Sequence, residues 1–102
     1  METAVLKREV HPFLIALGIY IRQKRLDLGM SQETLANKAN LHRTYVSDVE
    51  RGMRNLTIGS CLQIANGLGM QLNEMISGVD HLLQAQASCA LQTLPVALQP
   101  LS

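Results

Sequence analysis

The sequence predicts a compact all-α domain of five helices, with a possible extra C-terminal helix or tail. Only 3% of the 102 residues are aromatic, and the apolar residues are mostly aliphatic or Met. This composition suits packed helices better than β-sheets, whose strands favour aromatic and β-branched residues. Apolar residues also recur at helical spacing between residues that start and stop helices.

The chain length fits one domain with one core. We expect residues 1–11 to form a flexible lead-in, residues 12–80 the domain, and residues 81–102 an apolar tail. The tail contains no Asp, Glu, Lys or Arg, and we expect it either to join a dimer or to be partly disordered. No apolar run reaches the roughly 18 residues that a membrane-spanning helix needs. The sequence therefore predicts a cytoplasmic protein without a membrane partner.

The first helix is predicted to start at Pro12, because proline fits the first helical turn, and to end at Gly29. Leu17, Ile21 and Leu28 recur between these two residues at helical spacing. They predict the side of the helix that faces the core.

The second and third helices are predicted on either side of Asn40. Ser31 is the expected cap of the second helix. Asn40 should end that helix, because asparagine tolerates the left-handed conformation. His42 is the expected cap of the third helix, which should run to about Arg51 and stop at Gly52.

The fourth helix is predicted to follow its cap, Thr57, and to end at Gly69. A short fifth helix carries Leu72 and should close near Gly78. The stretch from His81 to about Leu94 is expected to be weakly helical at best.

The second and third helices, joined by a single tight turn, describe a helix-turn-helix. Ala36 must be small where the third helix crosses the second, and Asn40 occupies the turn. Val46 and Val49 should face the core and hold the two helices at their angle. With Gln32 at the start of the second helix, these residues form a set that is specific only as a group.

These residues resemble the XRE family of bacterial regulators, which is related to phage repressors and Cro. The resemblance spans Leu17 to Ile76 and includes "IRQKRLDLGMSQETLANKANL", "YVSDVERG" and "LTIGSCLQIANGLGMQLNEMI". The stretch "HRTYVSDVERGMRNLTI" is similar to the controller proteins of restriction–modification systems. The chain departs from the family pattern at Asn40, where Gly is commonest, and at Leu56, where many members have Pro.

The resemblance implies that the helix starting at His42 lies in the major groove of double-stranded DNA. Arg43 could then donate a bidentate pair to guanine, and Thr44 could contact a thymine methyl group. Ser47 is short enough to lie close to the bases. Asp48 could accept from a cytosine amine or pair with an arginine, either Arg43 or Arg51, since phosphates would otherwise repel it.

Other positions are expected to contact the DNA backbone and to position the domain without reading sequence. Gln32 would direct its side chain and backbone N–H at a phosphate. Tyr45 could make such a contact or pack at the edge of the core. The complete set of expected DNA-binding residues is Gln32, His42, Arg43, Thr44, Tyr45, Ser47, Asp48, Arg51, Arg54 and Asn55.

The distribution of charge agrees with an anionic partner for the first half of the chain. All nine Lys and Arg residues lie between Lys7 and Arg54. The first 54 residues also contain six acidic residues, whereas the chain from Asn55 onward contains only Glu74 and Asp80. An ordinary solvated face would account for this distribution equally well on charge alone.

The resemblance also places Arg25 against Glu50 as a largely buried ion pair.

We expect the protein to act as a homodimer on a palindromic operator, because one recognition helix contacts too few base pairs to find its site. The expected dimer interface is uncharged and apolar, as self-complementary pairing favours. The residues expected in this dimer interface are Met70, Leu72, Met75, Ile76, Leu82 and Leu83.

Other classes of function fit the sequence less well. It contains no metal-ligand spacing, no glycine-rich phosphate loop and no catalytic constellation, so we expect neither an enzyme nor a cofactor. The alternative is an antitoxin or an anti-repressor-like module whose main partner is another protein. RNA polymerase and a cognate toxin are further candidate partners.

Overall fold

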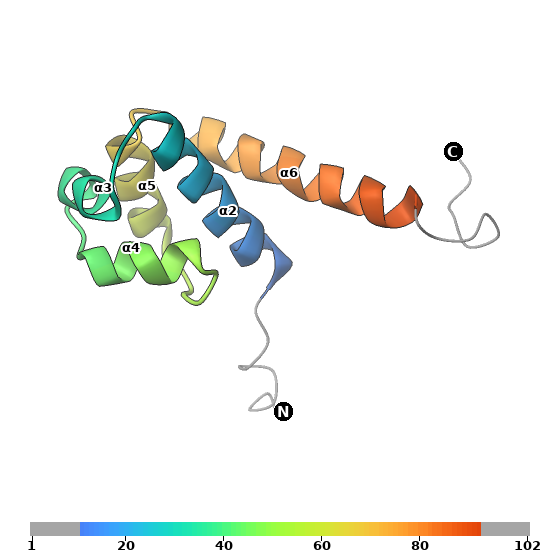
Figure 1. Ribbon diagram of the computed structural model, residues 1–102, viewed down its shortest axis with the longest axis horizontal. Helices are drawn as coiled ribbons and strands as arrows, with labels where there is room; N and C mark the ends of the chain where they lie inside the picture. Colours follow the sequence, from blue (N-terminus) through green and yellow to red (C-terminus); the bar gives the residue numbers. More distant parts are fainter. Residues whose placement is uncertain (1–10, 93–102) are drawn as a thin grey trace, which may run out of the picture.

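The computed structural model describes residues 11–92, which form five α-helices (Figure 1). Residues 1–10 and 93–102, which include most of the expected lead-in and the end of the expected tail, lie outside the described residues. The described part contains no β-strand, so the predicted all-helical fold is confirmed. The helices are α2 (Pro12–Asp27), α3 (Gln32–Ala39), α4 (Arg43–Glu50), α5 (Ile58–Gly67) and α6 (Leu72–Gln92).

Side-chain caps set the starts of α2, α3 and α5. The Ser31 hydroxyl accepts a hydrogen bond from the Thr34 N–H at 3.0 Å and caps α3. Thr57 caps α5 in the same way, through the N–H of Ser60 at 3.0 Å. Pro12 is the first residue of α2, as predicted. The cap before it is His11, whose Nδ1 accepts from a backbone N–H, a role that the sequence analysis missed.

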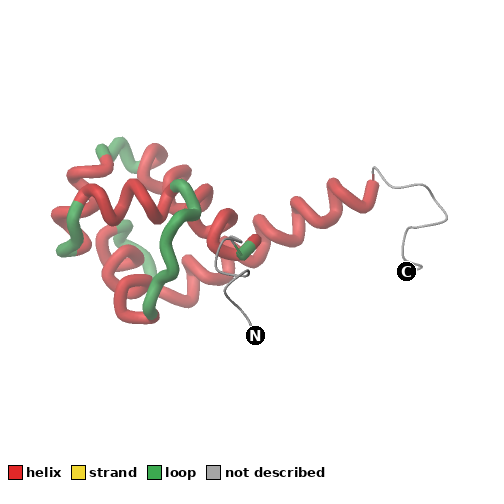
Figure 2. Tube along the Cα trace, turned by 90° about the horizontal axis from the view of Figure 1, so that it is seen from below, coloured by secondary structure: helices red, strands yellow, loops and turns green. Residues whose placement is uncertain are grey.

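The predicted end of the fifth helix near Gly78 is wrong. Helix α6 runs without a break from Leu72 to Gln92, and both views show its second half extending away from the other helices (Figures 1 and 2). Gly78 lies where α6 crosses α2, and a Cβ there would overlap the Tyr20 ring. Residues 79–92 contain no Gly or Pro and are rich in Leu, Gln and Ala, which favour helix. The expected boundary at residue 80 therefore falls inside a helix.

One core joins all five helices. Its largest fully buried side chains are Leu17, Ile21, Leu35, Ile64, Met75, Val46 and Val79. Met75 has no exposed surface, so it belongs to this core and cannot form the dimer interface expected for it. None of the described helices combines the length and the apolar character that crossing a bilayer requires.

Candidate nucleic-acid interface

Helices α3 and α4 are joined by the tight turn that the sequence predicts. Asn40 adopts the left-handed conformation, with φ 60° and ψ 45°. The backbone N–H of Leu41 then donates to the carbonyl of Ala36 at 2.8 Å, which closes the end of α3. From α5, Gln63 donates through Nε2 to the carbonyl of Ala39 at 3.0 Å. The turn is therefore fixed by its own backbone and by α5.

Close packing against α2 sets the position of α4. Val46 and Val49 are buried beneath α4, as expected. On the facing helix, a Cβ at Gly18 would lie 2.5 Å from the Val49 carbonyl oxygen and 2.6 Å from that of Glu50. Only glycine fits at this crossing without displacing the backbone. The sequence analysis missed Gly18, because nothing near it in sequence indicates that α4 crosses there.

The structure pairs Arg25 of α2 with Glu50 at the end of α4. Arg25 Nε donates to Glu50 Oε2 at 2.6 Å and Nη2 donates to Oε1 at 3.0 Å. The side chains are only 7% and 2% exposed. Arg25 Nη1 also donates to the Met30 carbonyl at 2.8 Å. The hydrogen bonds to Glu50 raise the pKa of Arg25 above its ordinary value, although burial opposes them. This bidentate pair ties α4 to the scaffold.

Gln32 belongs to the same network. Its Nε2 donates to Glu50 Oε1 at 3.0 Å. The amide group expected to reach a phosphate is therefore already bonded inside the protein. The Gln32 backbone N–H lies in the first turn of α3, where backbone donors lack helical partners. It is this N–H, more than the side chain, that is placed to meet an anion.

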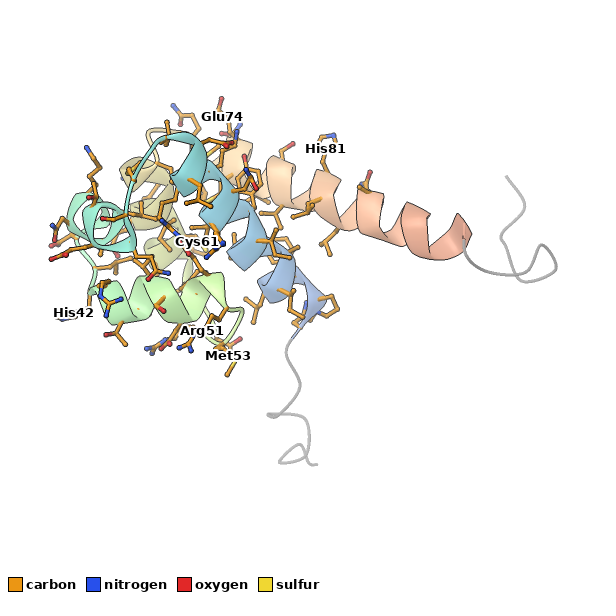
Figure 3. The ribbon with its side chains drawn as sticks, viewed as in Figure 1. His42, Arg51, Met53, Cys61, Glu74 and His81 are labelled. Atoms are coloured by element: carbon orange, nitrogen blue, oxygen red, sulfur yellow. The ribbon has the colours of Figure 1, made fainter. Side chains whose placement is uncertain are left out.

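The beginning of α4 presents its side chains to solvent. His42, Arg43 and Thr44 are exposed, and Ser47 one turn later is half-buried. His42 occupies the cap position, but its side chain makes no cap hydrogen bond. Figure 3 shows His42 and Arg51 at opposite ends of α4. The part of the chain that the structure describes offers no side-chain hydrogen-bond partner to Arg43 or Thr44, so both are available to an external ligand.

A cluster of four side chains occupies the other end of α4 and the loop after it. Asp48 accepts from Arg51 Nη2 at 2.6 Å and from Arg54 Nη2 at 3.2 Å. The hydrogen bond from Arg51, and then that from Arg54, hold the pKa of Asp48 below its usual value, although burial opposes them. The Arg54 guanidinium carbon lies 4.6 Å from the centroid of the Tyr45 ring, which is a cation–π contact.

This cluster decides between alternatives that the sequence left open. Asp48 pairs with Arg51 and not with Arg43, and Arg54 is a second partner that was not foreseen. Tyr45 is half-buried and packs against the core. Its ring therefore supports Arg54 while also forming part of the core edge. Asn55 is exposed in the loop after α4.

The remaining residues of the expected dimer interface lie on or just before α6. Ile76 is 36% exposed, and the others are partly buried against the core; they are Met70, Leu72, Leu82 and Leu83.

No group of His, Cys, Asp or Glu within residues 11–92 could hold a metal ion. Cys61 is buried, and burial raises the pKa of its thiol.

A helix-turn-helix family model matches residues 21–75, more than half of the chain. The match includes the turn and α4, whose geometry is described above. The chain therefore belongs to the helix-turn-helix (XRE) family, whose members are DNA-binding transcriptional regulators and not enzymes.

Within this family the chain is similar to the control proteins of restriction–modification systems. It is 43% identical over 63 residues to control protein C.BamHI of Bacillus amyloliquefaciens, a match that covers 61% of this chain and 78% of that protein. It is 38% identical over 60 residues to control protein C.MunI of a Mycoplasma species, covering 59% and 78%.

Solved structures agree with these sequence matches. The restriction–modification controller protein C.AhdI of Aeromonas hydrophila superposes with a TM-score of 0.62 at 38% identity, covering 64% of this chain and 98% of that one. The controller protein C.Esp1396I, solved as a tetramer in complex with its natural 35 base-pair operator, superposes with a TM-score of 0.69 at 38% identity. That match covers 72% of this chain and 97% of the other.

Proposed function

We propose that this protein reads an operator in the major groove of double-stranded DNA with the exposed N-terminal turn of α4. One observation carries the proposal: Arg43 and Thr44 project from a helix whose position is fixed by Gly18 and by a buried ion pair. A rigidly held helix presenting free polar side chains is what direct readout requires. The C.Esp1396I tetramer, solved in complex with its natural 35 base-pair operator, supports operator binding as the function.

Roles within the site follow from the chemistry of each side chain. Arg43 pairs with guanine, Thr44 contacts a thymine methyl group, and Ser47 lies close to the base edges. The Gln32 backbone N–H, together with the arginines that follow α4, binds phosphates. His42 and Asn55 flank this surface at its two ends.

Two recognition helices are needed to select one operator from a genome. We therefore propose a homodimer on a palindromic site with half-sites about one helical turn, roughly 34 Å, apart. Its interface is the apolar surface of α6 and the turn before it, formed by Met70, Leu72, Ile76, Leu82 and Leu83. These residues carry no charge, which suits a two-fold interface.

DNA binding is tested by fluorescence anisotropy on the sequence upstream of the protein's own gene. Arg43→Ala should weaken operator binding by roughly 1–3 kcal/mol and relax one base position. Arg54→Ala should weaken operator binding without singling out a base position, should also weaken binding to unrelated DNA, and should reduce the salt dependence. Arg22→Ala, which removes an exposed charge from α2, is the control. An unmodified protein that shows no salt-sensitive binding at micromolar concentration refutes the proposal.

The dimer is tested by analytical ultracentrifugation. Ile76→Lys places a charge on the proposed interface and should yield a monomer. Ile58→Lys adds the same charge at a residue that is 74% exposed on α5 and should leave the dimer intact. If the unmodified chain is a monomer at tens of micromolar, the homodimer is wrong.

A further inference from the structure

Asp48 lies between two arginines at the C-terminal end of α4. Its Oδ1 accepts from Arg51 and its Oδ2 accepts from Arg54, at 2.6 and 3.2 Å. We propose that Asp48 is a positioning residue, which holds Arg51 and Arg54 together as a preformed phosphate clamp and does not itself read a base. This inference rests on the proposed function, because the clamp needs DNA as its ligand.

Arg51 and Arg54 need a contact that positions them, because neither lies within the helical residues of α4. The helix ends at Glu50, so that Arg51 is its C-terminal cap and Arg54 lies in the following loop. Long side chains at these positions would otherwise sample many rotamers, and ordering them on binding would weaken the complex. Asp48, in the last turn of α4, is close enough to bond both.

Tyr45 fixes the second arginine from another direction. Its ring lies under the Arg54 guanidinium, 4.6 Å from ring centroid to guanidinium carbon, and is itself packed against the core. Arg54 is thus held by a carboxylate at one edge and an aromatic ring on one face. Each guanidinium has five N–H groups, and the bonds to Asp48 occupy one on each arginine. The remaining donors are free for phosphate oxygens.

Base reading by Asp48 is disfavoured by the same geometry. Both carboxylate oxygens are already engaged in charge-assisted bonds, which are stronger than a bond to a neutral cytosine amine. The side chain is only 23% exposed. The two positive charges also screen the carboxylate from the phosphates, so that the three groups together carry one net positive charge.

The test measures operator and scrambled DNA binding over a range of salt concentrations. Asp48→Asn should reduce the ratio of operator to scrambled affinity by at least about twofold, as expected for coupled neighbours. The reduction should be spread over all base positions. Scrambled DNA should bind at least as tightly as before, because a negative charge is removed. Glu33→Gln, which neutralises an exposed acid on α3, controls for charge alone and should leave the ratio unchanged.

The decisive comparison uses a protein that lacks both arginines. In an Arg51→Ala, Arg54→Ala background, adding Asp48→Asn should no longer lower the ratio, because Asp48 acts only through the arginines. A loss confined to one base position, or one that persists in this background, would show that Asp48 reads a base and would overturn the inference. A scrambled-DNA affinity that falls in step with operator affinity would also overturn it. An unmodified protein that fails to bind DNA would instead refute the proposed function and the clamp together.

Discussion

Replacing Glu50 by Gln tests how much of the fold depends on the contact between α2 and α4. The Glu50 carboxylate accepts three hydrogen bonds, two from Arg25 and one from Gln32, at 2.6 to 3.0 Å. The amide of Gln has one acceptor oxygen. If that oxygen replaces Oε1, the bonds from Arg25 Nη2 and from Gln32 remain. The new amide nitrogen then faces Arg25 Nε, donor against donor.

The guanidinium stays charged, because arginine does not lose its proton in proteins. A buried charge without its partner typically costs roughly 3–5 kcal/mol. Each kcal/mol changes the melting temperature of a domain of this size by about 4–8 °C. A loss of about 3 kcal/mol therefore lowers the melting temperature by roughly 12–24 °C. Because small domains are stable by only about 5–15 kcal/mol, Glu50→Gln should remove a large share of the free energy of unfolding.

The assay is thermal unfolding followed by far-UV circular dichroism. Glu33→Gln makes the same chemical change at an exposed site in the first turn of α3 and should cost only about 0.3–1 kcal/mol. Equal melting temperatures for the two variants would refute the reasoning. Arg25→Met combined with Glu50→Leu should be more stable than Glu50→Gln alone, because no unpaired charge remains.

Three further outcomes follow from the geometry. Gly18→Ala should destabilise the fold by roughly 1–3 kcal/mol in urea unfolding, because its Cβ would meet the backbone of α4. Gly59→Ala on α5 should stabilise by about 0.4–1 kcal/mol in the same assay, since the nearest atom lies 3.7 Å away. The Asp48 carboxyl should titrate below its usual pKa in an NMR titration. The unfolded chain then binds the proton more readily, so the stability from this group should be present above about pH 4 and lost at lower pH.

The bounds of most helices could be predicted because they depend on neighbouring residues. Ser31 and Thr57 cap the helices that begin beside them, and Asn40 adopts the left-handed conformation that its chemistry permits. Gly78 shows the limit of such reasoning. A glycine that ends a helix and one that admits a crossing side chain look alike in sequence, and the crossing partner, Tyr20, lies 58 residues earlier.

In the candidate site, too, some features depend on neighbouring residues and others on tertiary packing. The exposed N-terminal turn of α4 could be predicted from its helical register, because the buried positions Val46 and Val49 define the opposite face. The pairing of Asp48 could not be predicted in full. Arg51 lies one turn further along the helix, whereas Arg54 is brought to Asp48 by the path of a loop. That path depends on packing and not on any local pattern.

The two ends of α4 differ in how many contacts hold them to the rest of the protein. The last turn contains Glu50 and abuts Gly18. Within residues 11–92, no side-chain hydrogen bond links Arg43 or Thr44 of the first turn to the rest of the protein. Substitutions in the first turn can therefore accumulate without bringing the chain near its stability threshold. Duplicated copies of this gene could diverge to new operators by point mutation while their products fold equally well.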